Sequence, residues 1–177
     1  MEFFSNEKHL ESILTQLVNH LKTNRVWLLT GEMGSGKTTL VRNLGSLLGF
    51  EKEVTSPSYS IINEYSCKNN LLNINRVYHV DLYRLNHIEE ALEVGIEEII
   101  FGNDLVIIEW PNLIYPLLGK HTFAEIHIEV LDNQNRRYIL KQNEQASIFY
   151  SRKEFLSDKG RNEGLCKGKS RAKNWHC

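Results

Sequence analysis

The chain has 177 residues and a formal net charge of −1, and 41% of its residues are hydrophobic and 24% charged. This length and balance fit one globular domain with a sizeable core. No apolar run reaches the roughly 18 residues of a membrane-spanning helix, and the polar, acidic start is unlike a signal peptide, so we expect neither a membrane protein nor a secreted one. The three cysteines lack metal-ligand spacing and indicate free thiols in a reducing cytosol, so the expected location is cytoplasmic.

Positive charge is concentrated at the end of the chain. From Ser151 to Cys177, eight Lys or Arg residues stand against three Asp or Glu residues, a net +5 that leaves −6 for the residues before them. The sequence therefore predicts a folded domain over residues 1–145 and a basic, flexible tail over residues 146–177.

The first part of the chain is predicted to form a helix, a strand, a glycine-rich turn and a second helix. Apolar residues recur at helical spacing within residues 5–22, which is typical of a helix packed on a sheet. Val26 to Thr30 is an apolar run that predicts a buried strand. The second helix ends at Gly49, and its apolar face comprises Leu40, Val41, Leu44, Leu47 and Leu48.

The turn between this strand and this helix matches the pattern G-x-x-x-x-G-K-[ST] from Gly31 to Thr38. Glycines lack a Cβ atom, so the backbone can turn its N–H groups toward an anion, and the N-terminus of the following helix also attracts phosphate. Lys37 would bring a positive charge to the β- and γ-phosphates, and the Thr38 hydroxyl suits Mg²⁺. Because the turn lies between a strand and a helix, a chance glycine turn is the weaker interpretation, and a nucleotide site is predicted.

The middle of the chain adds further strands. Residues 55–58 form a hydroxyl-rich turn, residues 59–65 have an extended pattern, and residues 66–75 read as a hairpin or surface loop. A strand is then expected over residues 76–85. This region therefore contributes strands to the predicted sheet.

A helix and a second buried strand follow. Asn86 and Glu89 have the spacing of a capping box, which predicts one helix extending to Ile100. The apolar run from Asp104 to Trp110 predicts a buried strand that Pro111 ends.

The order of these elements defines the fold class. Residues 124–130 alternate between apolar and polar, and residues 137–141 are placed to pair with them in an antiparallel hairpin. Strands that alternate with helices around a phosphate loop predict a parallel sheet between helices. We therefore expect an α/β, P-loop NTPase-like three-layer fold with a mainly parallel sheet and antiparallel hairpin additions.

Two acidic residues are candidates to complete the site. Asp81 and Glu109 follow apolar strands, and open α/β sheets place their sites at the carboxyl ends of such strands. Glu109 is in the place of the acid that works with Thr38 on Mg²⁺, and Asp81 could orient the attacking water. Either acid alone would be read as a turn or cap residue, but two of them beside a phosphate loop favour function. Trp110 is equally consistent with packing and with a nucleotide contact.

Two missing features favour ATP over GTP. The sequence contains no N-K-x-D stretch to recognise guanine, and Asp81 is not followed by glycine three residues later. ATP is therefore the expected nucleotide.

Five blocks of the sequence, taken in this order, resemble the TsaE (YjeE) family, the bacterial ATPases of tRNA threonylcarbamoyladenosine biosynthesis. The blocks are GEMGSGKTTLVRNL, VTSPSYSIINEY, YHVDLYRL, IEEALEVGIEEII and LVIIEWP, and the resemblance covers about residues 5–141. It implies a protein that binds ATP and Mg²⁺, hydrolyses ATP slowly alone and works with the TsaB–TsaD pair. That pair transfers a threonylcarbamoyl group to tRNA, and ATP turnover is thought to reset the complex between rounds.

The resemblance also implies roles for single residues. Thr38 and Glu109 match the Mg²⁺ ligands, and Asp81 matches an acid needed for activity, which would orient either water or the metal. Residues 56–59 match a mobile switch-like loop, and Trp110 matches an aromatic residue near the nucleotide. The phosphate-binding loop is matched by Gly34, Ser35, Gly36, Lys37, Thr38 and Thr39. Two residues depart conservatively from the usual family pattern, namely Glu32, where Asp is usual, and Ser58, where Thr is usual.

The basic tail has no counterpart in the typical family length. One interpretation is a disordered, solvated extension. The other is an arm that contacts tRNA, since clustered Lys and Arg residues attract phosphate backbones and Trp175 could stack on a base. Contact with tRNA is otherwise expected only through the partner proteins.

Two other functions remain as alternatives. A small phosphotransferase is disfavoured because Arg84 is the only arginine between Arg76 and Arg136, so an arginine-bearing lid is missing. A nucleotide-dependent binding module, in which hydrolysis is incidental, would also show weak turnover alone. Stimulation of hydrolysis by TsaB–TsaD would separate this module from the ATPase.

Overall fold

One seven-stranded sheet organises the computed structural model, which describes residues 1–6, 10–68, 70, 72–119 and 121–143. Its strand order is β1-β7-β6-β2-β5-β4-β3. The central strands β6, β2, β5 and β4 are parallel, whereas β1, β7 and β3 pair antiparallel at the two edges. The strands are β1 (Glu2–Asn6), β2 (Val26–Thr30), β3 (Ile62–Ser66), β4 (Arg76–Asp81), β5 (Leu105–Glu109), β6 (Phe123–Val130) and β7 (Asn135–Asn143).

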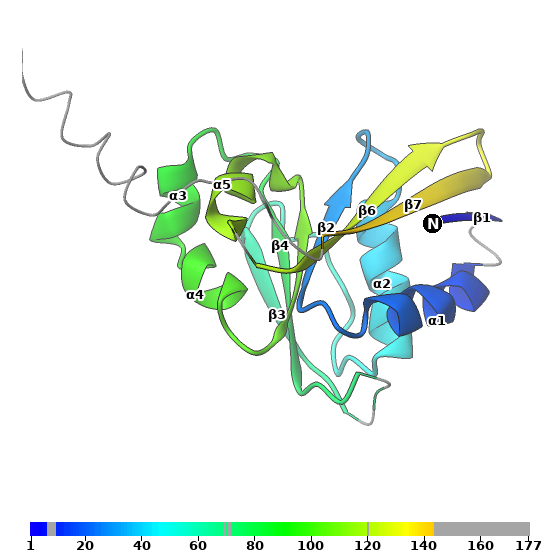
Figure 1. Ribbon diagram of the computed structural model, residues 1–177, viewed down its shortest axis with the longest axis horizontal. Coiled ribbons are helices and arrows are strands. Elements are labelled where there is room, and N and C mark those ends of the chain that lie inside the picture. The colour runs from blue at the N-terminus through cyan, green and yellow to red at the C-terminus, as the bar shows by residue number, and fades with distance from the viewer. Residues whose placement is uncertain (7–9, 69, 71, 120, 144–177) are drawn as a thin grey trace, which may run out of the picture.

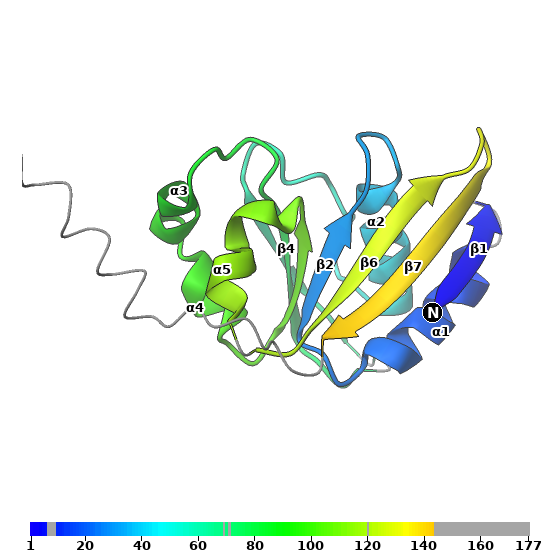
Figure 2. The ribbon, with the colours of Figure 1, turned by 45° about the horizontal axis from the view of Figure 1, so that its top comes forward.

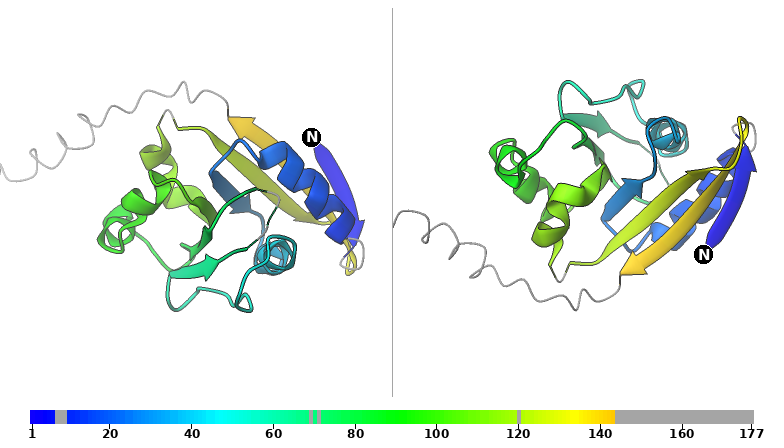
Figure 3. Two further views of the ribbon diagram at one scale, coloured as in Figure 1. Left: turned by 90° about the horizontal axis from the view of Figure 1, so that it is seen from below. Right: turned by 90° about the horizontal axis from the view of Figure 1, so that it is seen from above.

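Helices cover both faces of this sheet (Figures 1 and 2). The views along the sheet in Figure 3 show α1 and α2 on one face and α3, α4 and α5 on the other. The helices are α1 (Leu10–Leu21), α2 (Lys37–Leu47), α3 (Ile88–Glu93), α4 (Ile96–Ile100), the 3₁₀ helix η2 (Pro111–Ile114) and α5 (Tyr115–Leu118). The predicted three-layer α/β fold, with its two antiparallel hairpins β3–β4 and β6–β7, is confirmed.

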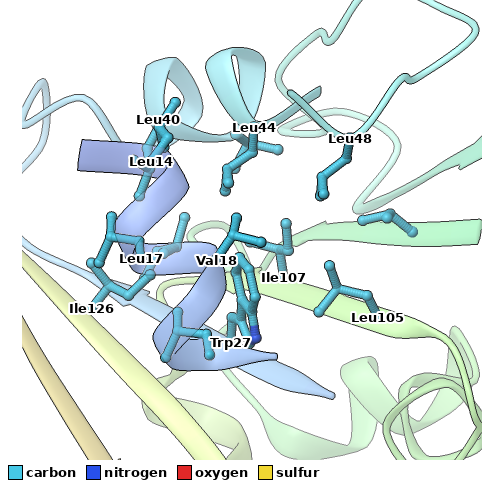
Figure 4. Close-up of a cluster of buried hydrophobic side chains, with 14 of the residues drawn as sticks. Leu14, Leu17, Val18, Trp27, Leu40, Leu44, Leu48, Leu105, Ile107 and Ile126 are labelled. Carbon is cyan, nitrogen blue, oxygen red and sulfur yellow. The ribbon is translucent and has the colours of Figure 1, made fainter. Parts of the chain in front are cut away.

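The core lies on both faces of the central strands. In β2, Trp27 and Leu29 join the apolar cluster of α1 and α2, while Val26 and Leu28 join the cluster of α4 and α5. Figure 4 shows the Trp27 indole beneath the leucines of α1 and α2, and its Nε1 donates a hydrogen bond to the Asn24 carbonyl oxygen at 3.0 Å. A strand that is buried on both faces has a continuous apolar sequence, and β2 could be predicted from the sequence for this reason.

The register of the parallel strands assembles the site. Asp81 of β4 lies opposite Glu109 of β5, and Leu29 of β2 lies opposite the same Glu109. The carboxyl ends of three parallel strands therefore meet at one edge, where β2 continues into the glycine-rich turn.

The predicted helix over residues 5–22 is wrong at its start. Ser5 and Asn6 belong to β1, and the structure describes α1 as Leu10–Leu21. β1 pairs with β7 from Glu2 opposite Ile139 to Asn6 opposite Asn135. A short edge strand is stabilised by a partner that is distant in the sequence, so local periodicity carries no signal for it.

The single helix predicted to end at Ile100 is two short helices. Gly95, between α3 and α4, has a φ of +80°, a left-handed conformation that ends a helix. The capping box lies one residue later than predicted, with His87 as the N-cap and the Glu90 carboxylate accepting from the His87 backbone N–H at 2.9 Å. The strand predicted over residues 76–85 already ends at Asp81, since β4 spans Arg76–Asp81.

The predicted basic tail, residues 146–177, lies outside the described residues. Within the ranges that the structure describes, no helix combines the length and the apolar character needed to cross a membrane.

Candidate functional site

The glycine-rich turn has the backbone geometry of an anion-binding loop. Gly31, Gly34 and Gly36 have φ values of +135°, +76° and +103°, which residues with a Cβ atom rarely adopt. At Gly31 a Cβ atom would also lie 2.4 Å from the Ile128 carbonyl oxygen of β6, so no side chain fits there. Gly36 is the N-cap of α2 and provides no side-chain cap, so N–H groups of the first turn are left for a ligand.

Lys37 is folded back into this loop. Its Nζ donates hydrogen bonds to the carbonyl oxygens of Gly31 at 3.0 Å and Glu32 at 2.9 Å, and lies 3.9 Å from the centroid of the Trp110 ring. Burial lowers the pKa of the Lys37 ammonium, while the negative charges of Glu109 and Asp81 act to raise it. The ammonium is thus held ready in the loop by weak acceptors that a phosphate could replace.

Glu109 lies at the centre of a buried polar network. Its Oε1 accepts a hydrogen bond from the Thr38 hydroxyl at 2.9 Å and another from Nε2 of His79 at 2.8 Å. Glu109 is 3% exposed and His79 is 0% exposed. Because a carboxylate oxygen only accepts, the hydrogen of this contact lies on Nε2 of His79.

Asp81, on the neighbouring strand, is held from a different direction. Its Oδ2 accepts from the Ser58 hydroxyl at 2.7 Å, and its Oδ1 accepts from the Tyr83 backbone N–H at 3.0 Å. The Ser58 hydroxyl also lies 2.7 Å from that of Ser56. The turn over residues 56–59 therefore contacts the site through its hydroxyl groups.

The backbone after this turn is strained. Ile61 has a φ of +64°, which is unfavourable for a β-branched side chain. Its carbonyl oxygen accepts from the Asp81 N–H at 2.9 Å, and its own N–H donates to the Pro57 carbonyl oxygen at 2.6 Å. Such strain is characteristic of functional sites, where surrounding contacts stabilise an otherwise unfavourable conformation.

These groups share a pocket with a volume of about 280 Å³. It is lined by Met33, Gly34, Gly36, Lys37, Thr38, Thr39, Ser56, Ser58, Asp81, Tyr83, Glu109 and Trp110. Of the predicted residues Gly34 to Thr39, Asp81, Glu109 and Trp110, only Ser35 is not among these. Ser35 is buried under the loop, and its N–H donates to the Glu32 carbonyl oxygen at 3.1 Å.

The floor of this pocket suits a magnesium ion. The Thr38 hydroxyl and the Glu109 carboxylate are oxygen donors that already lie within 2.9 Å of each other. Oxygen ligands and shared phosphate oxygens are the environment that Mg²⁺ prefers. Thr38 and Glu109 are therefore the residues that would hold it.

His79 and Tyr83 join the site without having been singled out in the sequence, and Arg136 also contacts it. His79 contacts Glu109, and its signal was its position two residues before Asp81, which places both on one face of β4. The Tyr83 ring lies 5.0 Å from that of Trp110. Arg136 donates from Nε to the Ser35 carbonyl oxygen at 3.2 Å. This contact joins β7 to the loop, and no local sequence pattern predicts it.

Comparison with known proteins bears on the whole of this domain. The family model of the threonylcarbamoyl adenosine biosynthesis protein TsaE matches residues 4–139. The tRNA threonylcarbamoyladenosine biosynthesis protein TsaE of Rickettsia conorii is 34% identical over 163 residues, which cover 89% of this chain and 87% of that protein. The protein of the same name from Borreliella burgdorferi is 33% identical over 129 residues, 72% of this chain and 90% of its own.

The fold has a solved counterpart as well. The crystal structure of Bacillus subtilis YdiB superposes with a TM-score of 0.56 at 22% identity, over 92% of this chain and 95% of that one. This likeness concerns the fold alone, whereas the family match and the relatives cover most of the sequence. The chain therefore belongs to the TsaE family.

Proposed function

We propose that this chain binds ATP with Mg²⁺ in the described pocket and hydrolyses the bond between the β- and γ-phosphates. The observation that carries the proposal is the convergence of Lys37, Thr38 and Glu109 beside the glycine-rich loop. A loop of this geometry and a paired hydroxyl and carboxylate are the parts that phosphoryl transfer requires.

The loop and Lys37 hold the phosphates. Backbone N–H groups of the loop and of the first turn of α2 face the anion, which the helix dipole also favours. Lys37 exchanges its hydrogen bonds with the Gly31 and Glu32 carbonyl oxygens for contacts with phosphate oxygens. Thr38 and Glu109 would hold Mg²⁺, which when bound would neutralise negative charge on the phosphate oxygens.

Asp81 prepares the attacking water. Its carboxylate lines the pocket beside Glu109 and accepts a hydrogen bond from the water as the water oxygen attacks the γ-phosphorus. The bond between that phosphorus and the bridging oxygen breaks, and ADP leaves. The Ser58 hydroxyl fixes one oxygen of Asp81 and so links the turn over residues 56–59 to this step.

The biological role that we propose is an accessory one in tRNA threonylcarbamoyladenosine modification, in the cytoplasm and together with TsaB–TsaD. Membership of the TsaE family and the names of the relatives support it. Hydrolysis would be weak alone and stimulated in the complex, as the resemblance to the TsaE family implies.

The test is ATP hydrolysis by the purified chain alone, and then with TsaB–TsaD and unmodified tRNA. A Lys37→Ala variant serves as the blank. We expect strong stimulation and multiple-turnover modification of tRNA, both lost in the variant. Nucleotide binding without stimulated hydrolysis would favour a binding module, and absence of any effect of TsaB–TsaD would turn the search to small-molecule phosphate acceptors.

Contact with tRNA is a separate part of the proposal. Truncation after residue 150 removes the net charge of +5. If the tail contacts tRNA, the truncated chain loses tRNA affinity at low salt and the loss shrinks as salt rises. Unchanged affinity would leave TsaB–TsaD as the route to tRNA.

A further inference from the structure

His79 is a buried imidazole whose contacts point to a function. It lies in β4, is 0% exposed and donates from Nε2 to Oε1 of Glu109 at 2.8 Å. Its other ring nitrogen, Nδ1, is also buried and has no hydrogen-bond partner among the residues that the structure describes. The centroid of its ring lies 6.5 Å from that of Tyr65.

A purely structural role explains this arrangement poorly. A histidine retained only for packing would have both ring nitrogens satisfied or would be replaced by an apolar residue, because an unpaired buried nitrogen is destabilising. Here Nδ1 of the ring has no hydrogen-bond partner within the described part of the chain, and Nε2 points at the carboxylate of Glu109. The contact with Glu109 is therefore what the imidazole supplies.

The two hydrogen bonds on Glu109 differ in what happens to them when a metal binds. Both end on Oε1, one from Thr38 and one from His79. Thr38 is itself a predicted magnesium ligand, so its hydroxyl would turn toward the ion. Of the two donors, His79 alone would then still hold the carboxylate.

We infer that His79 is a positioning residue that fixes the Glu109 carboxylate in the orientation in which it accepts the metal. This inference rests on the proposed function, because it assigns Glu109 to a metal that accompanies the nucleotide. Groups behind a metal ligand act by limiting its rotation, and their removal typically costs about 10- to 100-fold in metal affinity.

Two amide variants provide a matched test. Glutamine carries its amide nitrogen as many bonds from Cβ as Nε2 of histidine, whereas asparagine carries it at the place of Nδ1. His79→Gln therefore keeps a donor toward Glu109, and His79→Asn moves the donor one atom short. His79→Leu removes the donor altogether.

Two affinities of the full-length chain are measured. Electron paramagnetic resonance gives the affinity for Mn²⁺ in the presence of ADP, and a second titration gives the affinity for ADP in EDTA, without metal. We expect Mn²⁺ binding about 10- to 100-fold weaker in His79→Asn and His79→Leu, close to wild type in His79→Gln, and unchanged ADP affinity in all three. Metal-free thermal unfolding identifies any variant that fails to fold, and the Gln and Asn pair decides the outcome if His79→Leu does.

Equal Mn²⁺ affinity in the folded Gln and Asn variants would overturn the inference. Failure of the proposed function looks different, because the wild type itself would then bind neither ADP nor Mn²⁺ with ADP. The contact can be checked without nucleotide as well. The ¹⁵N resonances of His79 in the metal-free chain should show hydrogen on Nε2, and Glu109→Gln should shift the Nε2 resonance.

Discussion

Two acids occupy corresponding places on neighbouring strands and yet are held in different ways. Asp81 and Glu109 lie opposite each other in the register of β4 and β5, and both are buried. Glu109 is held by Thr38 from the first turn of α2 and by His79 from inside the sheet. Asp81 is held by Ser58 and by the Tyr83 backbone, which belong to connecting segments.

The comparison separates a fixed acid from an adjustable one. Side chains on helices and strands are positioned more firmly than side chains on loops, and loops are where rearrangements concentrate. We therefore expect Glu109 to keep its place through the reaction cycle, and Asp81 to respond to the turn over residues 56–59.

The largest effect is expected at the fixed acid. Glu109→Gln keeps the shape of the side chain but removes the charge that would hold Mg²⁺, so ATP turnover should fall about a thousandfold, toward the upper range for loss of one preorganised electrostatic group. Steady-state ATP hydrolysis measures this. Glu89→Gln, at an exposed position, is the matched control. An equal fall in ATP turnover in this control would mean that the loss in Glu109→Gln does not report on the site.

A smaller effect is expected at Asp81. Asp81→Asn keeps the contact with the Tyr83 N–H but removes the acceptor for water, so turnover should fall about a hundredfold with ATP affinity unchanged. Single-turnover hydrolysis and equilibrium ATP binding separate the two quantities. Asp104→Asn, at the other end of β5, is the control, and intact turnover in Asp81→Asn would refute the assigned role.

The link between the turn and Asp81 should contribute less again. Ser58→Ala removes the hydrogen bond from the Ser58 hydroxyl to Oδ2 of Asp81. A hydrogen bond to a charged group contributes about 1.5–3 kcal/mol. Because the turn lies near solvent, we expect the lower value, which corresponds to a fall in turnover of about tenfold. Ser58→Thr keeps the hydroxyl and should remain within about twofold of wild type. Equal turnover in Ser58→Ala and Ser58→Thr would show that the Ser58 hydroxyl does not link the turn to Asp81.

The smallest effect is expected at Trp110, beside the fixed acid. Trp110→Phe keeps a ring under the Lys37 ammonium but weakens a cation–π contact of about 0.5–1 kcal/mol. Because this contact is given up when ATP binds, ATP affinity should rise, by at most about two- to fivefold. ATP should also change the indole fluorescence of the wild type, since Lys37 leaves the ring. Persistence of that signal in Trp110→Phe would assign it to Trp27 or Trp175 instead.

The parts of the fold that the sequence predicts are those with a local cause. The buried strands β2 and β5 and the helix α2 are continuous or periodic apolar patterns, and their bounds agree with the prediction to within a few residues. β1 was not predicted because its pairing with β7 is non-local. The break at Gly95 was not predicted because one glycine inside a helical pattern does not determine whether the helix continues.

The site divides in the same way. Lys37, Thr38, Asp81 and Glu109 could be named from the loop pattern and from strand ends, and the structure brings all four into one pocket. His79 was not predicted, because a position two residues before Asp81 does not distinguish a site residue from a core histidine of an apolar strand. Its role depends on Glu109, thirty residues further along the chain, and only the register of β4 and β5 brings the two together.

The hydrogen bonds of Lys37 within the glycine-rich loop have a consequence for nucleotide selection. Its ammonium can leave the Gly31 and Glu32 carbonyl oxygens only for a ligand whose phosphate reaches Nζ. We expect a nucleoside monophosphate to leave these bonds in place, and a diphosphate or triphosphate to replace them with stronger, charge-assisted ones. On the proposed function, we therefore expect the loop to discriminate by the length of the phosphate chain before any contact with the base is made.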